Sequence, residues 1–179
     1  VDVDENAEWL PRFGIRAQLD SSFKNEEYFG YGPQESYIDK HNSCYKGLFK
    51  KTIDEEITGE YIIPQDCGNH YDSLWGCVRD DGGIGLLFRS DKGFDFSALP
   101  YSIEQLNAAN HRFELGKQSG CNLLIDYKRS GVGSNACGPV LREQYRLDEK
   151  HFTFNLELLP ITSKTKDCMT AANTEYKLK

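Results

Sequence analysis

The chain has 179 residues, a length that fits a single domain and is enough to bury a sizeable core. Its net charge of -7, with lysines and arginines scattered along it, would repel a phosphate backbone and excludes nucleic acid as a partner. No apolar run approaches the ~18 residues of a membrane span, which excludes a membrane partner as well. Many aromatic residues, separated by 16 glycines, favour a β-rich fold.

Two strands are predicted in the first third of the chain. Residues 12–19 alternate as in a half-buried strand, and residues 27–31 form a second, shorter strand that ends at Gly32-Pro33. The longest acidic cluster, Asp54-Glu55-Glu56, follows them. Because charged side chains are usually exposed, this cluster is predicted to be a solvated turn rather than a metal site.

The middle of the chain predicts a hairpin and one short helix. Residues 74–78 and 85–89 are apolar runs on either side of an Asp-Asp-Gly-Gly turn at 80–83, a pattern typical of a β-hairpin. Ser102, with Gln105 three residues later, forms a capping box. We therefore expect a helix over 102–109, lying on the sheet.

Two more strands are predicted near the end of the chain. Residues 121–127 form one, and residues 151–158 alternate most clearly, with their apolar side chains predicted to point inward: Phe152, Phe154, Leu156 and Leu158. About eight strands, one short helix and no β-α-β alternation indicate an all-β, antiparallel β-sandwich. We treat 1–179 as one domain, with residues 160–179 as a tail whose packing is not predicted.

The glycine-rich segment 130–139 lies between these strands and is a candidate site. It has no lysine at the position that a phosphate-binding loop requires, and no helical pattern follows it, so phosphate binding is disfavoured. A tight, structured loop is predicted instead, with Pro139 stiffening its exit. Cys137 could act as a nucleophile with a histidine as base, an alternative that only geometry decides.

Cysteines and histidines give no strong metal signal. The six cysteines, at 44, 67, 77, 121, 137 and 168, include no C-x-x-C pair, so a structural zinc site is disfavoured and reduced, mostly buried thiols are predicted. The four histidines, at 41, 70, 111 and 151, lie far apart in the sequence. Each is predicted to be a surface or hydrogen-bonded residue rather than a metal ligand.

Several segments together resemble the large bacterial β-galactosidases of glycoside hydrolase family 2. Residues 28–39 are similar to their W-x-G-x-G-P-x-E-x-Y-x-D segment and residues 61–69 to their Y-V-x-P-Q-E-x-G-N segment. Residues 94–101 and 110–112 resemble the stretch that follows, and 131–139 the loop G-x-G-x-x-x-W-G-P. The matches keep the family's order from about residue 10 to about residue 158.

The resemblance is to the C-terminal domain of those enzymes (small chain, domain 5), which forms part of a galactose-mutarotase-like supersandwich. It implies that the catalytic acid and nucleophile lie in a TIM barrel outside this chain, together with the family's magnesium and sodium ligands. This chain would then hold no cofactor and hydrolyse nothing alone. The implied partners are the catalytic TIM barrel of the same enzyme and a lactose-like galactoside, and the parent is expected to be a cytoplasmic bacterial homo-oligomer. The acidic start without Met fits a piece of a longer chain.

The same resemblance implies the site residues. The loop residues Ser134, Asn135 and Cys137 would lie at the aglycone side of the substrate pocket. Well-known members carry a tryptophan at the position of Cys137, which stacks on the sugar beyond the cleaved bond. A thiol offers less flat area than an indole, so weaker aglycone binding is expected. Glu35 and Asp39 are expected to tie loops down.

Two alternatives stay open from the sequence. One is a mutarotase-like aldose epimerase, with His111 or His70 as acid and Glu35 as base. The other is a free-standing carbohydrate-binding module, which the aromatic residues beside polar turns would suit. If the first strands of the supersandwich are absent, an exposed sheet edge capable of self-pairing is also expected.

Overall fold

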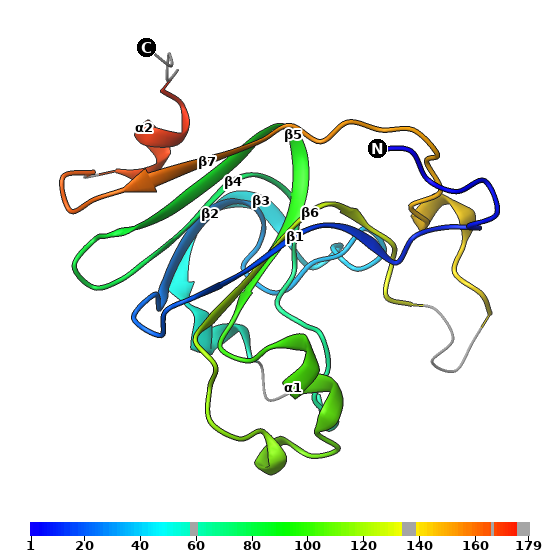
Figure 1. The fold of residues 1–179 in the computed structure, drawn as a ribbon, viewed down its shortest axis with the longest axis horizontal. Coiled ribbons are helices and arrows are strands. Elements are labelled where there is room, and N and C mark those ends of the chain that lie inside the picture. Colours follow the sequence, from blue (N-terminus) through cyan, green and yellow to red (C-terminus); the bar gives the residue numbers. More distant parts are fainter. Residues whose placement is uncertain (58–60, 134–138, 166, 175–179) are drawn as a thin grey trace.

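A computed structural model describes residues 1–57, 61–133, 139–165 and 167–174 (Figure 1). The fold is all-β and antiparallel, which confirms the predicted class. The strands are β1 (Arg12–Leu19), β2 (Asn25–Gly32), β3 (Tyr45–Thr52), β4 (His70–Arg79), β5 (Gly85–Leu99), β6 (Cys121–Arg129) and β7 (Leu156–Ile161). The helices are α1 (Ile103–Ala108) and α2 (Cys168–Ala172), with short 3₁₀ turns η1 (Ile53–Glu56), η2 (Arg112–Glu114) and η3 (Glu143–Tyr145).

The sheet is organised around the long strand β5. The strand order is β1-β6-β5-β4-β2-β3, and β7 also pairs with β5. The first half of β5, from Gly85 to Ser90, pairs with β7, and the second half, from Asp95 to Leu99, pairs with β6. In Figure 1 the green ribbon of β5 accordingly runs through both parts of the sheet. In the described part of the chain, β1 and β3 end the strand order as its edges.

The sheet has apolar packing on both faces. The larger core contains aromatic and aliphatic side chains from β2, β4, β5 and β6, among them Tyr28, Phe88 and Phe96. Neighbouring residues of β4 face opposite sides, since Val78 packs in this core whereas Cys77 packs against α2. The helix α2 therefore covers part of the second face of the sheet.

Most of the predicted elements are confirmed. The strand at 12–19 and the hairpin around the Asp-Asp-Gly-Gly turn are present as β1 and β4–β5, and β6 extends the predicted strand at 121–127. Ser102 caps α1, accepting a hydrogen bond from the Gln105 amide while the Gln105 side chain bonds back to the Ser102 amide. The helix α2 was not predicted, so the expectation of one short helix is wrong.

The strand predicted at 151–158 is shifted. The pairing of β7 with β5 begins only at Leu156 and continues to Ile161, and Leu158 is 45% exposed instead of pointing inward. Phe152 is nevertheless buried, because its ring stacks on Tyr127 at 4.5 Å between centroids and meets Phe13 edge-on. The alternation in the sequence thus reflects burial of aromatic rings against β1 and β6 rather than pairing in a ladder.

None of the helices in the described ranges is long and apolar enough to cross a membrane.

Candidate functional site

The base of the glycine-rich loop is anchored by one carboxylate. Asp39, which follows β2, accepts hydrogen bonds from the backbone N–H of Val132 at 3.0 Å and of Gly133 at 2.8 Å. A Cβ atom on Gly131 would lie 2.5 Å from the Asp39 carboxyl carbon, so this close approach requires glycine. The prediction that Asp39 ties a loop down is confirmed.

The other side of the loop base is held by the backbone. The Ser130 hydroxyl donates to the Leu10 carbonyl at 2.7 Å and accepts from the Leu147 amide at 2.9 Å. The Gly131 amide donates to the Tyr145 carbonyl at 2.8 Å. Three separate parts of the chain therefore fix residues 130–133, which gives the loop a rigid starting point.

The residues predicted to line the pocket lie beyond this base. Ser134, Asn135 and Cys137 fall outside the described residues, so their predicted place at the aglycone side stays a prediction.

Glu35 joins the segment after β2 to the segment before β4. Its carboxylate accepts hydrogen bonds from Lys40 Nζ at 2.5 Å, from the Gly68 amide at 3.0 Å and from the Tyr61 hydroxyl. Burial pushes the pKa of Glu35 up, but the bonds from Lys40, Tyr61 and Gly68 outweigh it, and the net pKa is lowered. Glu35 is therefore an anion that ties two loops together, as predicted.

An arginine network lies next to the loop base. Arg129, the last residue of β6, donates to Asp66 at 2.6 Å and lies over the Tyr37 ring at 5.0 Å from the ring centre. Arg12 of β1 donates to the same Asp66 oxygen at 3.0 Å. The 61–69 segment is thus bonded to both β1 and β6, and this network holds the strand end from which the glycine-rich loop begins.

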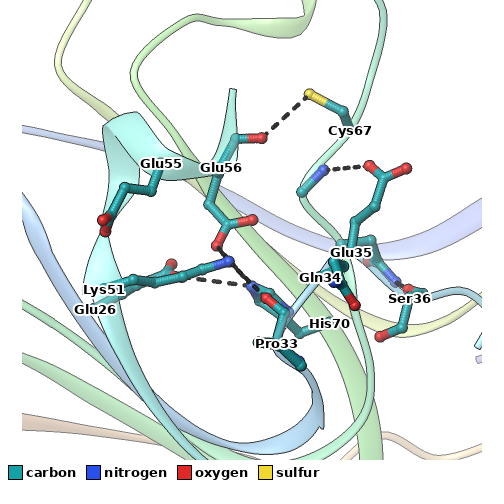
Figure 2. Close-up of polar contacts among 12 residues, drawn as sticks. Glu26, Pro33, Gln34, Glu35, Ser36, Lys51, Glu55, Glu56, Cys67 and His70 are labelled. Atoms are coloured by element: carbon teal, nitrogen blue, oxygen red, sulfur yellow. Dashed lines mark hydrogen bonds and ion pairs between the residues drawn. The ribbon is translucent and has the colours of Figure 1, made fainter. Parts of the chain in front are cut away.

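A second polar group, which we call the ion cluster, lies in the aromatic core. It consists of Glu26 from β2, Lys51 from β3, Glu56 from η1 and His70 from β4 (Figure 2). His70 Nε2 lies 3.2 Å from a Glu56 oxygen and 3.4 Å from a Glu26 oxygen, and Lys51 pairs with Glu56. The His70 ring stacks on Tyr28 at 3.9 Å between centroids, so the cluster is walled by aromatic rings.

The burial of the cluster shifts its proton equilibria. Burial lowers the pKa of His70, but the Glu56 and Glu26 carboxylates outweigh it and raise the pKa to about 9. Burial and the Glu56 charge raise the pKa of Glu26 to about 8. Burial raises the pKa of Glu56, but the charges of His70 and Lys51 and the hydrogen bond with His70 lower this pKa to about 2. The cluster therefore retains protons at neutral pH and behaves as one coupled unit.

The ion cluster contains metal-ligating side chains but already holds its own cation. One ligand atom from each of Glu26, Glu56 and His70 lies within 4.8 Å of the others. Lys51, however, pairs with Glu56 and donates to the Pro33 carbonyl at 3.0 Å. A divalent ion would have to displace this ammonium group and the retained protons, so the arrangement fits an internal ion cluster better than a metal site.

Sequence reasoning missed the ion cluster. The prediction of a solvated turn at 54–56 holds for Asp54 and Glu55, which are exposed, but is wrong for Glu56, which is 2% exposed. Ile53 and Glu56 lie three residues apart and are the two buried residues of η1. That spacing was the one local signal that Glu56 points inward with an apolar neighbour.

The histidine–glutamate pairs of the epimerase alternative are not assembled. His70 is fully buried and bonds within the ion cluster, whereas His111 is exposed and pairs with Glu114 at 2.9 Å. Neither histidine is among the hydrogen-bond partners of Glu35 described above. Among the described residues, Glu35 therefore pairs with neither of the two histidines that the epimerase alternative names.

The described cysteines are free thiols, as predicted. Cys67, Cys77, Cys121 and Cys168 are buried and Cys44 is partly exposed. Cys137 lies outside the described residues, and its part in chemistry stays a prediction.

Comparison with known proteins gives the family. A family model described as the beta galactosidase small chain matches residues 1–158. The β-galactosidase of Actinobacillus pleuropneumoniae is 40% identical over 153 residues, which cover 84% of this chain and 14% of that protein. The β-galactosidase of Staphylococcus xylosus is 38% identical over 89% of this chain and 16% of its own length, and that of Kluyveromyces lactis is 35% identical over 83% and 14%. The chain thus spans about a seventh of the length of these relatives, and by the family match and these identities it belongs to the β-galactosidase small-chain family.

Proposed function

We propose that this chain is the C-terminal domain of a glycoside hydrolase family 2 β-galactosidase, which removes terminal β-D-galactose from substrates such as lactose. The catalytic glutamates would lie in a TIM barrel elsewhere in the polypeptide, and this chain would contribute the 130–139 loop to the aglycone side of the pocket. The family match over residues 1–158 carries this proposal. The anchored loop base supports it.

The role proposed for this chain is to position a loop rather than to perform chemistry. Glu35, Asp66 and Glu56 are each engaged with basic partners, so none of these carboxylates is available as a general acid or base. The loop base, in contrast, is fixed by Asp39 and by the backbone of Tyr145. A rigid base limits the freedom of whatever the loop presents, and that is how a positioning element lowers the cost of binding a substrate.

The isolated chain is expected to be inactive. Purified residues 1–179 should release no nitrophenol from a nitrophenyl β-D-galactoside above the buffer rate, because the proposed nucleophile and acid lie outside the chain. The rest of the polypeptide, supplied in trans, should restore turnover. Clear turnover by residues 1–179 alone would overturn the proposal that the catalytic residues lie outside this chain.

Asp39→Asn is expected to weaken aglycone binding in the full-length enzyme. The amide cannot accept both loop hydrogen bonds with the strength of a carboxylate, and each charge-assisted bond contributes about 1.5–3 kcal/mol. We expect KM for lactose to rise about 10-fold with little change in kcat, which corresponds to about 1.4 kcal/mol of lost binding. Steady-state kinetics with lactose and with a nitrophenyl galactoside measure the two constants.

The matched control for this variant is Asp148→Asn. Asp148 is exposed and lies beyond the loop, so its amide variant should keep the KM of the parent.

Cys137→Trp should strengthen aglycone binding, the opposite of the effect of Asp39→Asn. The expected signs are stronger inhibition by glucose and more transglycosylation. If both loop variants leave glucose inhibition and transglycosylation unchanged, the loop is not part of the aglycone subsite.

A further inference from the structure

Two buried thiols meet beneath the C-terminal helix. Cys77 Sγ, on β4, lies 3.3 Å from Cys168 Sγ, which belongs to the first residue of α2. Both residues are 0% exposed. They pack with Trp75, Leu87 and Ile161 on the sheet face that α2 covers, which is a different face from the large aromatic core.

We propose that Cys77 and Cys168 form a reversible disulfide that fastens α2 to the sheet. A disulfide has an S–S distance of about 2.05 Å, so the two sulfur atoms need to approach by about 1.3 Å. The pair is distinct among the described cysteines, since no other two sulfur atoms there contact one another. The Cys67 thiol contacts the Glu56 carbonyl and that of Cys44 contacts the Gln34 carbonyl.

The helix that carries Cys168 is short enough to open. A helix of five residues has little stability of its own, so α2 depends on its contacts with the rest of the chain. Asp167 caps its first turn, and Arg89 of β5 donates to the Thr174 carbonyl at 2.8 Å. Local opening of such a segment costs less than global unfolding and gives small molecules access to the buried thiols.

The exchange chemistry needs only a low-molecular-weight disulfide such as oxidised glutathione. The Cys168 thiolate attacks one sulfur of the reagent, whose S–S bond breaks and releases one thiolate. The Cys77 thiol then loses its proton and attacks the Cys168 sulfur, releasing the second thiolate. In sum, two protein thiols and one small disulfide give one protein disulfide and two small thiols.

The assignment of Cys168 as the attacking group follows from its environment. The hydrogen bond with Cys77 lowers the pKa of Cys168 against the opposing effect of burial, while the same bond and burial raise the pKa of Cys77. Cys168 is also on the element that can open, whereas Cys77 is in the interior of a strand.

The disulfide would act on the part of the chain that follows the family match. The small-chain model ends at residue 158, and α2 lies after it. The disulfide would therefore bind this segment covalently to the sheet, across 91 residues of sequence. The proposal does not depend on the proposed function, because none of the residues it uses belongs to the loop base.

In the test, the purified protein is equilibrated in glutathione buffers that contain an increasing fraction of oxidised glutathione. Its free cysteines are then alkylated, and its peptides are mapped without reductant. We expect a peptide pair joined through Cys77 and Cys168, two fewer alkylated cysteines, and reversal by dithiothreitol. Because the crosslink closes a loop of 91 residues, Tm of the oxidised protein should rise by about 10 °C. Cys168→Ser and Cys77→Ser should each abolish the joined peptide and the rise in Tm.

Cys44→Ser is the matched control, because it removes the partly exposed thiol and should leave both effects intact. The proposal is overturned if Cys77 and Cys168 remain alkylated after full oxidation, or if glutathione is recovered only on Cys44. Mapping of the unsubstituted chain decides the question even if a serine variant fails to fold.

Discussion

Replacing His70 with alanine is expected to lower the free energy of unfolding by about 3–5 kcal/mol, the cost of removing one partner from a buried ion pair. The imidazolium lies within 3.4 Å of both Glu26 and Glu56 and is buried from bulk solvent, since the residue is 0% exposed. The substitution also removes a ring that stacks on Tyr28 at 3.9 Å and packs beside Phe96. An unbalanced carboxyl group and a cavity are therefore created at the same point in the core.

Urea unfolding followed by tryptophan fluorescence measures this loss. The matched control is His111→Ala, whose exposed ring pairs with Glu114 and stacks on a neighbouring phenyl ring, and whose effect should stay within about 0.5 kcal/mol. In the double variant with Glu56→Gln, the loss should be smaller than the sum of the two single losses, because the glutamine removes the negative charge that His70 balances. A loss below about 1 kcal/mol for His70→Ala would show that the ion cluster contributes little to the fold.

The stability of the chain is expected to fall as the pH rises from 6.5 to 9. The pKa of His70 is about 9 in the folded chain, against 6.5 for the free side chain, so the folded state keeps a proton that the unfolded state has lost over this range. Glu26 acts in the same direction, because its pKa of about 8 lies above its usual 4.5. Each contribution is complete below the unfolded pKa and is lost as the pH passes through the folded one.

The expected decrease in the free energy of unfolding is on the order of 3 kcal/mol across this range. Chemical denaturation at a series of pH values and constant ionic strength measures it. Glu26→Gln should flatten the part of the decline that lies near pH 8, whereas a Gln substitution at the exposed Glu5 should leave the profile unchanged. A stability that stays constant or increases over this interval would contradict the proton retention described here.

The parts of the fold that could be predicted have local causes. The alternation of β1, the turn between β4 and β5, and the capping box at Ser102 are each encoded within about ten residues. The strand β3 was not predicted, because its lysines and its exposed Tyr45 give no clear alternation, and it is formed by pairing with β2 along eight residues. Its structure thus depends on a partner rather than on its own pattern.

The candidate site likewise has one part that could be predicted from the sequence and one part that could not. The roles of Asp39 and Glu35 could be predicted from the resemblance to family segments, and their hydrogen bonds confirm them. The ion cluster could not, because its charges come from three strands and one 3₁₀ turn and become buried only when these meet. Before folding, the three-residue spacing from Ile53 is the one local feature that distinguishes Glu56 from the exposed Glu55, and it does not identify the partners of Glu56.

The pairing of β1 with β6 has a consequence for synthesis on the ribosome. β1 is the first of these strands to be made, but every residue of it pairs with β6, ~100 residues later in the chain. At ~5–20 residues per second, β1 remains without its partner for about 5–20 s after it is made. Pairing over so long a separation is also slow in itself. The emerging chain therefore passes through a period in which a complete strand exposes its hydrogen-bonding edge, and it is in this interval that the nascent polypeptide most needs protection from aggregation.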